Sequence, residues 1–529
     1  MSIEASGQAG PRDGTVPLMP QTALDTSANR LRLSIVDVTF ALFCLIPPLV
    51  FGAQLLNSDG DAARHIRMGE LMLRGGLYQN DPFSFTRPDE PILLTEWASR
   101  IAYALAHSWA GLTGVALLAG LLIGTSTALL VLFLRRRGVD PLLSYLVGIA
   151  AAVISQLHWL ARPHLFSLVA FALLLFLLEP GERRRTWWFA ALFIPWANLH
   201  GAYVLGFILI AVCLAGALAE ARLSPDRREH WLSLARWYGT GLLVAIAASV
   251  LNPQGPLLLW HVVELLGNTT LTSGTHEFMS PDFHQPYAKI FLVFVGLIIT
   301  AFAVIGTRPT LPRLGIILLM FAGACVARRN IALFGIIALP TAALHVDSAW
   351  RSLQPGVLKR VRTVFQEGER IAAPGRWVPI FLIPILALGA MRGSVMNVQM
   401  VPNRFDPEVF PVEAVEYAKS AGLEGRLFSF FTWGGYVVYA WPGQKIFIDG
   451  MTDYFGDELL LDYGKINRLG AGWAERIEHW GITLVLVHPE SQLDYQLRRE
   501  PGWTVRYEDE TAVLLQRAVS TTPYSTGTQ

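Results

Sequence analysis

Two aspartates and a histidine lie close together directly after the first apolar run of the chain. Asp59 and Asp61 precede a stretch with helical periodicity, and His65 follows Asp61 by four residues on the same predicted helical face. A carboxylate paired with such a histidine suits proton abstraction or the binding of a divalent cation. The same pattern is typical of a helix start, where Asp59 or Asp61 caps a helix over 62–74. The residues alone leave both interpretations open.

A third carboxylate, Glu96, lies in the same long segment, 56–110, which is too long for a simple connector. Glu96 falls in the first turn of a second predicted amphipathic helix that opens at Thr95. It is either a favourable charge at a helix N-terminus or a second acidic group that faces Asp61.

Further polar side chains lie at the ends of otherwise apolar runs, where they are costly in a membrane unless they line a cavity. A single histidine at such a place is usually a packing residue, and a hairpin explains Gly201 in Asn198-Leu199-His200-Gly201 but not His200. Seven histidines fall in this one layer, which favours a polar cavity. The candidate substrate-binding residues are His65, His164, Asn198, His200, Glu277 and Asp282.

The composition indicates an integral membrane protein. The 529 residues are 53% hydrophobic and 16% charged, against about 25% charged in an average soluble domain. The formal net charge of +1 provides no basic excess for a nucleic-acid partner. The three cysteines all fall inside apolar runs, so neither a disulfide framework nor a CxxC metal site is predicted.

The apolar runs predict a helical polytopic protein with about eleven spans, preceded by a disordered tail over residues 1–32. Arginines and lysines gather in alternate loops, which places the N-terminus in the cytoplasm and both the 56–110 loop and the chain after about Arg392 outside. The predicted spans are 33–55, 111–134, 141–158, 164–179, 187–199, 202–220, 234–251, 287–306, 314–327, 331–345 and 377–392.

One arginine doublet, Arg328-Arg329, breaks this charge rule because it falls on the outer side. Insertion energetics gives no reason for it, so the doublet calls for a functional explanation.

The C-terminal part, 394–529, is of a different kind. Short β-type runs at 426–430, 445–448, 483–487, 504–507 and 512–515 alternate with helical stretches at 411–420, 457–466 and 474–480. They predict a small extracytoplasmic α/β domain. Two motifs of this domain would either bind a glycan or serve as turns: Trp433-Gly434-Gly435-Tyr436 and Phe447-Ile448-Asp449-Gly450. We favour turns for most of these residues. Asp449 and Asp453 are the residues to test.

The order of these motifs along the chain resembles the bacterial membrane glycosyltransferases of the GT-C superfamily, the branch related to protein mannosyltransferases and lipopolysaccharide-modifying transferases. The motifs are D-x-D-x-x-x-H, D-P-F-S-F-T and E-W in the first loop, then R-P-H-L-F-S, W-A-N-L-H-G, L-N-P-x-G and S-P-D-F, and W-G-G-Y and F-I-D-G-x-x-D-x-Y in the tail. The resemblance runs from about residue 33 onward. It implies a transmembrane catalytic module over 33–393, located in the bacterial inner membrane.

The resemblance also implies a chemistry. A first-loop acid is the catalytic base, which matches Asp61, with Asp59 as the alternative and Glu96 as the further acidic residue. The donor is a polyprenyl-phosphate-linked sugar, and the acceptor is an extracytoplasmic glycan, lipid or protein. The lipid phosphate needs cations in the outer headgroup layer, for which the candidates are Arg328, Arg329, Arg162 and Lys289. The first loop lacks the side-by-side Asp-Glu pair of better-known relatives, so a divalent cation stays an open cofactor.

Two other classes fit parts of the pattern. A transporter or flippase of a lipid-linked glycan would also need outer cations and a polar cavity, although transporters commonly carry ionisable groups near the membrane midplane. A non-catalytic envelope assembly protein would use the tail to bind a partner. Sugar transfer that depends on one carboxylate would distinguish a glycosyltransferase from both of these classes.

Overall fold

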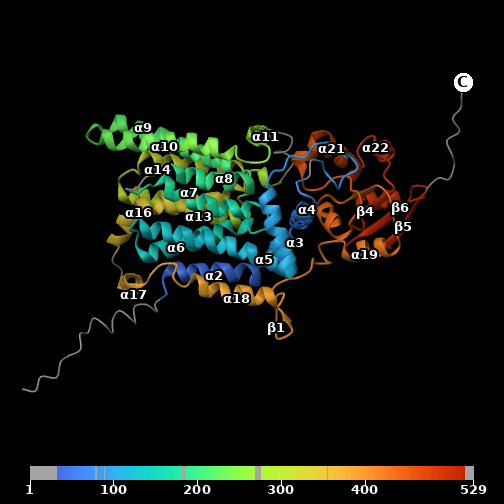
Figure 1. Cartoon of the computed structure of the whole chain (residues 1–529), viewed down its shortest axis with the longest axis horizontal. Coiled ribbons are helices and arrows are strands. Elements are labelled where there is room, and N and C mark those ends of the chain that lie inside the picture. Colours follow the sequence, from blue (N-terminus) through green and yellow to red (C-terminus); the bar gives the residue numbers. More distant parts are fainter. Residues whose placement is uncertain are drawn as a thin grey trace, which may run out of the picture.

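The chain forms a long helical bundle with a smaller α/β domain at one end, as the computed structural model shows (Figure 1). The structure describes residues 33–77, 80–88, 90–181, 185–267, 276–353 and 356–518. The predicted disordered tail, 1–32, lies outside these residues.

The bundle contains helix in each of the eleven predicted spans. Its elements are α2 (Ile35–Val50), α3 (Gly52–Asn57), α5 (Trp97–Arg136), α6 (Pro141–Ser155), η2 (Gln156–His158), α7 (His164–Leu178), α8 (Trp187–Leu199), α9 (Tyr203–Leu223), η3 (Pro225–Arg227), α10 (Arg228–Ser249), α11 (Pro256–Gly267), η4 (His276–Phe278), α13 (Pro286–Ile305), α14 (Leu311–Val326), α15 (Asn330–Leu333), η5 (Phe334–Ala338), α16 (Leu339–Ser352), α17 (Gly356–Ile371) and α18 (Val378–Ala390). The sequence did not predict α11 or the surface helix α17.

Five helices among the described residues are long and apolar enough to cross a membrane by themselves. They are Trp97–Arg136, Pro141–His158, Tyr203–Leu223, Pro286–Ile305 and Asn330–Ser352. Several others, such as α2 and α7, are apolar but shorter. The helical polytopic architecture is therefore supported, whereas the number eleven stays a prediction.

Helix α5 joins the first loop to the bundle without a connecting loop. Its helical geometry breaks at Ala110 and Gly111, where Gly111 has a φ of 63°. A Cβ at Gly111 would lie 2.4 Å from Asn403 Oδ1, so glycine meets both the backbone angle and the close approach. The predicted span, 111–134, starts at this break. The part of α5 before this break, 97–110, helps to frame the candidate site.

The C-terminal domain is built on a four-stranded sheet of order β3-β4-β6-β5. Strand β3 runs parallel to β4, with Phe428 paired to Val485, and the other pairs are antiparallel. One face packs Phe428, Val485 and Leu515 into the domain's own core. The elements are β1 (Ser394–Val395), β2 (Val398–Gln399), α19 (Val412–Ser420), β3 (Leu427–Ser429), η6 (Phe431–Trp433), α20 (Gly434–Ala440), α21 (Thr452–Asn467), α22 (Trp473–Trp480), β4 (Leu484–Val487), α23 (Gln492–Leu497), β5 (Trp503–Glu508) and β6 (Val513–Arg517).

The predicted strand at 445–448 is not a named strand, because Ile446 forms only isolated bridges, one to Leu427 of β3 and one to Ser84 of the first loop. Ile446 N–H donates to Phe83 O at 3.0 Å, and Phe85 N–H donates to Ile446 O at 3.1 Å. Thr86 Oγ1 adds a hydrogen bond to Phe447 O at 2.8 Å. The D-P-F-S-F-T motif of the loop is thus built into the edge of the C-terminal domain.

Candidate active site

The candidate site lies at the start of helix α4 (Asp61–Gly75), between the bundle and the C-terminal domain (Figure 1). Asp59 Oδ1 accepts a hydrogen bond from the Asp61 N–H at 3.0 Å. Asp59 therefore makes the helix-start contact that the sequence offered to either aspartate. Asp61 is the first residue of α4, and its carboxylate is left to interact with other groups.

Arg162 brings together three carboxylates from separate parts of the chain. Its Nε donates to Asp59 Oδ1 at 3.2 Å. Its Nη2 lies 3.2 Å from Asp61 Oδ2, and its Nη1 lies 3.5 Å from Glu277 Oε1. The Tyr103 hydroxyl fixes the backbone by donating to Arg162 O at 2.8 Å. Burial opposes the charge of Arg162, but Asp61 and Asp59 outweigh it and raise the pKa of the guanidinium.

This arrangement bears on the cation that the sequence left open. The oxygens of Asp59, Asp61 and Glu277 would suit a divalent ion, but Arg162 already lies at their meeting point and compensates their charge. Within the described part of the chain, no group of three or more His, Cys, Asp or Glu side chains has the geometry to hold a metal. The residues present do not fit a divalent cation unless Arg162 moves away.

The carboxyl group of Asp61 has the electrostatics of a proton acceptor. Burial is the largest influence and raises the pKa of Asp61, Arg162 lowers it, and the neighbouring Asp59 raises it again. A raised pKa makes a carboxylate a stronger base than an exposed aspartate.

The C-terminal domain contacts this site through glycines. A Cβ at Gly450 would lie 2.0 Å from Asp61 Oδ1. A Cβ at Gly435 would lie 2.2 Å from Gly60 O, and one at Gly60 would lie 2.4 Å from Thr432 O. Only glycine allows the domain to approach the start of α4 this closely.

A buried ion pair fixes the same junction. Arg64, on the first turns of α4, pairs with Asp81 at 3.2 Å and with Asp449, and all three side chains are at most 3% exposed. Asp449 Oδ1 also accepts the Met451 N–H at 2.9 Å. Asp449 therefore has structural partners, and the junction joins α4, the first loop and the domain.

Glu96 belongs to a second group of polar contacts near the cluster around Arg162. Its Oε1 is 3.5 Å from His200 Nε2, and the adjacent Trp97 donates its indole N–H to Asn198 Oδ1 at 2.7 Å. Asn198 in turn donates to Leu251 O at 2.9 Å, which ties the W-A-N-L-H-G and L-N-P motifs together. Burial raises the pKa of Glu96 to about 7, and Arg100 partly opposes this shift.

The sequence analysis missed Arg100, which is buried beside Glu96. Its side chain is 2% exposed, and among the described residues its Nε and Nη1 have no hydrogen-bond partner. Its Nη2 lies 3.9 Å from Met451 Sδ, next to an ion pair of 3.4 Å between His261 and Asp453. An arginine four residues after Glu96 on an amphipathic helix was the available signal.

The histidines predicted to bind substrate come together in part. The rings of His158 and His164 lie 5.6 Å apart, and those of His164 and His200 lie 6.4 Å apart. His200 Nδ1 shares a hydrogen bond of 2.8 Å with Ser167 Oγ. The buried Nδ1 of His65 has no partner in the part of the chain that the structure describes. Burial, followed by the charges of nearby arginines such as Arg100, lowers the pKa of His65.

The arginine doublet Arg328-Arg329 lies beside the Arg162 cluster. Arg329 N–H donates to Glu277 O at 3.2 Å, and the Arg329 guanidinium lies 4.6 Å from the centre of the Phe278 ring. Arg328 N–H donates to Met279 O at 2.9 Å.

Asp282 and Lys289 differ from the other candidates, because both are exposed. Asp282 accepts hydrogen bonds within its own turn, from the His284 N–H at 2.9 Å and from Gln285 Nε2 at 3.3 Å. The described contacts do not link Asp282 or Lys289 to Asp61.

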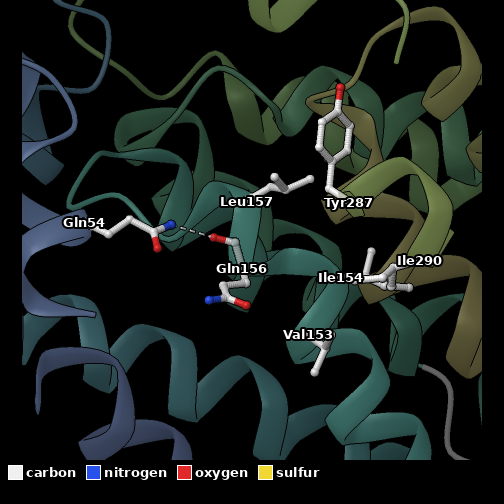
Figure 2. A pocket seen from close by; sticks show the side chains of 7 residues that line it. All are labelled: Gln54, Val153, Ile154, Gln156, Leu157, Tyr287 and Ile290. Atoms are coloured by element: carbon white, nitrogen blue, oxygen red, sulfur yellow. Dashed lines mark hydrogen bonds between the residues drawn. The ribbon is translucent and has the colours of Figure 1, made fainter. Parts of the chain in front are cut away.

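A groove of about 230 Å³ opens between α3, the end of α6 and α13 (Figure 2). One polar contact crosses it, from Gln54 Nε2 to Gln156 O at 2.9 Å. The groove adjoins η2, whose last residue, His158, contacts the His164 ring edge-on. Its lining is Gln54, Val153, Ile154, Gln156, Leu157, Tyr287 and Ile290.

The chain matches no family model and no curated protein sequence. Solved structures share its fold. The oligosaccharyltransferase AglB from Archaeoglobus fulgidus, in complex with an inhibitory peptide and a dolichol-phosphate, has a TM-score of 0.53 at 12% identity, covering 93% of this chain and 74% of that one. The same enzyme tethered to an acceptor peptide gives a TM-score of 0.55 with the same identity and coverage. ArnT from Cupriavidus metallidurans bound to undecaprenyl phosphate gives a TM-score of 0.51 at 13% identity, covering 91% of this chain and 98% of that one.

These matches show the fold: a helical bundle joined to a C-terminal domain, shared with the AglB and ArnT structures. The shared fold agrees with the fold that the resemblance to the GT-C superfamily implied.

Proposed function

We propose that this protein is a membrane glycosyltransferase that moves a sugar from a polyprenyl-phosphate donor to an extracytoplasmic acceptor. The observation that carries the proposal is the environment of Asp61. Its carboxylate has a raised pKa, lies against Arg162 and borders the C-terminal domain, within a fold shared with structures that hold dolichol-phosphate or undecaprenyl phosphate.

In the proposed reaction, the acceptor hydroxyl attacks the anomeric carbon of the sugar as Asp61 takes the hydroxyl proton. The bond from the anomeric carbon to the phosphate oxygen breaks, and the polyprenyl phosphate leaves with that electron pair. A single displacement of this kind inverts the anomeric centre. Asp59 acts as a positioning residue, because it holds the start of α4 and one edge of Arg162.

The leaving phosphate needs cationic side chains whose charge is not already neutralised by carboxylates. Arg162 is engaged by Asp59 and Asp61, so the doublet is the better donor-phosphate site, with Arg329 held beside Glu277 by its backbone. The apolar groove along η2 suits the isoprenoid chain, because it opens sideways between helices next to this layer (Figure 2). We place the site and residues 394–529 on the extracytoplasmic side and the N-terminus in the cytoplasm, in accordance with the arginine distribution.

The test is the release of polyprenyl phosphate from polyprenyl-phosphate-linked hexoses and pentoses, measured by mass spectrometry on purified full-length protein with an envelope extract as the acceptor source. Asp61→Asn should fold normally and lower turnover by about 10²- to 10⁴-fold, the usual contribution of a general base. Asp59→Asn is the matched control. It keeps an oxygen that can accept the Asp61 N–H, so it should lose much less activity.

Full turnover by Asp61→Asn together with an inactive Asp59→Asn would move the base by two residues. Activity in both variants would refute a base at this site. Movement of an intact donor across a bilayer without cleavage would instead indicate a flippase.

A further inference from the structure

A short hairpin follows α18 and presents apolar side chains to its surroundings. Strands β1 and β2 pair antiparallel, and Met396 and Asn397 form the tip between them. Met396 is 94% exposed, and Val398 and Met400 are 59% and 44% exposed. In Figure 1 the hairpin projects past α18 at the level where the helical bundle meets the C-terminal domain.

The tip of the hairpin carries a residue that its backbone does not favour. Met396 and Asn397 both have positive φ, 50° and 64°, as in tight two-residue hairpin turns. Glycine and asparagine are common at such positions, whereas a long apolar side chain is disfavoured there. A methionine at this place therefore points to a contact outside the chain rather than to the stability of the turn.

The polar groups of the hairpin are largely paired within it. Met400 N–H donates to Gly393 O at 2.8 Å, and Ser394 Oγ donates to Gln399 Oε1 at 2.8 Å. Gln399 Nε2 donates to Arg392 O at 3.0 Å. Internal pairing of this kind lets a segment enter the edge of a bilayer, where water does not replace lost hydrogen bonds.

The surface next to the hairpin indicates a lipid rather than a protein partner. On α18, Ile383 and Leu386 are 62% and 58% exposed, so the hairpin continues the apolar surface of a predicted span. Residues 377–405 contain two arginines, Arg392 and Arg404, and no aspartate or glutamate. An exposed cation such as Arg392 beside apolar side chains suits a layer of phospholipid headgroups.

A tryptophan lies at the same level as the base of the hairpin. Trp109, just before the break in α5, is 45% exposed. A Cβ at Gly389 would collide with its ring, so the indole packs against the last turn of α18. Tryptophan is enriched where a membrane meets water, and the hairpin begins shortly after this turn.

We propose that the hairpin lies in the interfacial layer of a phospholipid bilayer, in the leaflet that faces the C-terminal domain. Met396 and Val398 lie among the upper parts of the acyl chains, and Arg392 lies near the phosphates. The hairpin also fixes the level of the domain, because Asn403 directly after it accepts the Thr113 N–H at 3.2 Å, beside the break in α5. This contact is independent of the proposed transferase reaction, since it uses no residue of the candidate site.

The experiment places one environment-sensitive fluorophore on the hairpin of the full-length protein in vesicles of phosphatidylcholine and phosphatidylglycerol. Met396→Cys is labelled in a Cys325→Ala background, because Cys44 and Cys213 are 0% exposed and do not react in the folded protein. Lipids with a nitroxide near the top of the acyl chain should quench the label more than lipids with a nitroxide near its end, as expected at a depth of about 5–10 Å. Val505→Cys, on the exposed edge strand β5, is the matched control and should be quenched by neither lipid.

A pair of variants at Val398 tests the apolar contact with the label kept at position 396. Val398→Asp should shift the emission to the red and reduce quenching by the lipids, whereas Val398→Ile should leave both unchanged. Because Val398 is exposed, neither replacement endangers folding. Equal behaviour of the two variants would overturn the apolar contact.

The quenching pattern also distinguishes the occupants of the hairpin. A label at position 396 that is open to aqueous iodide and insensitive to the nitroxide lipids would overturn the proposal. A label that is shielded from iodide but not quenched by either lipid would indicate a protein or a second copy of the chain, and would overturn the bilayer as the occupant.

Discussion

Replacing Gly450 by alanine should disable Asp61 without unfolding the protein. The added Cβ would lie 2.0 Å from Asp61 Oδ1, whereas ordinary contact begins at 3.4 Å. The carboxylate must therefore move by the difference, 1.4 Å. Because Asp61 is the end of a side chain rather than backbone, this displacement costs little stability.

The same displacement is large for catalysis. A misplacement of about 1 Å in a reacting group can cost about 10²-fold in rate, so Gly450→Ala should lower turnover by at least this factor. Apparent donor affinity should change little, since the doublet Arg328-Arg329 is untouched. The assay is the release of polyprenyl phosphate, alongside a thermal transition measured on the same preparation.

Gly470→Ala is the matched control, because a Cβ there would meet its nearest neighbour at 3.5 Å. The double variant Asp61→Asn/Gly450→Ala should be no slower than Asp61→Asn alone, since both act through one carboxylate. Equal turnover by Gly450→Ala and Gly470→Ala would refute this prediction. So would a double variant whose rate loss is the product of the two single losses.

Two further predictions concern the junction and the pH dependence of stability. Asp449→Ala leaves the buried Arg64 with Asp81 alone and should lower the free energy of unfolding by about 3–5 kcal/mol in denaturant titrations. Glu508→Ala, the control, removes a partner of the part-exposed Arg498 and should lower it by less than about 1 kcal/mol. Equal losses in the two variants would contradict a buried ion pair at Arg64. Glu96 has a folded-state pKa of about 7, above its unfolded value, so its protonation stabilises the fold below about pH 4.5, and this contribution is lost as the pH rises to about 7. Between these pH values the wild-type protein should lose unfolding free energy on the order of 3 kcal/mol, and Glu96→Gln should remove this loss. A transition temperature that depends on pH equally in the wild type and the variant would disprove the shift.

The bundle was predictable because a membrane restricts the backbone to a small set of structures. In lipid, backbone polar groups must be paired within the segment, so an apolar run such as 111–134 folds as a helix whatever its neighbours are. The C-terminal runs followed the same local logic at β3, β4, β5 and β6. The segment 445–448 forms only isolated bridges, and one of its two neighbours, the first loop at Phe83 and Phe85, lies more than 350 residues earlier in the sequence, where local patterning cannot predict the pairing.

The sequence predicted most residues of the candidate site, but not which of them contact one another. Sequence spacing could not show which aspartate contacts the helix start, and in the structure Asp59 accepts the Asp61 N–H while Gly60 is the N-cap residue. Arg162 was predicted to bind phosphate, which stays a prediction, and its ion pairs with the two aspartates could not be read from the spacing. Arg100 was missed because a single charge in an amphipathic helix usually faces water, and only the tertiary structure buries it.

The contacts at α4 also explain why the first loop and the C-terminal domain carry motifs so far apart in sequence. Gly435 lies against Gly60, Gly450 against Asp61, and Asp449 pairs with Arg64, so the geometry of the site depends on contacts between the two segments. A domain held this closely cannot move away without releasing the start of α4 and, with it, the carboxylate of Asp61. The domain therefore forms a wall of the candidate site, and in the proposed reaction an acceptor would reach Asp61 with this wall in place.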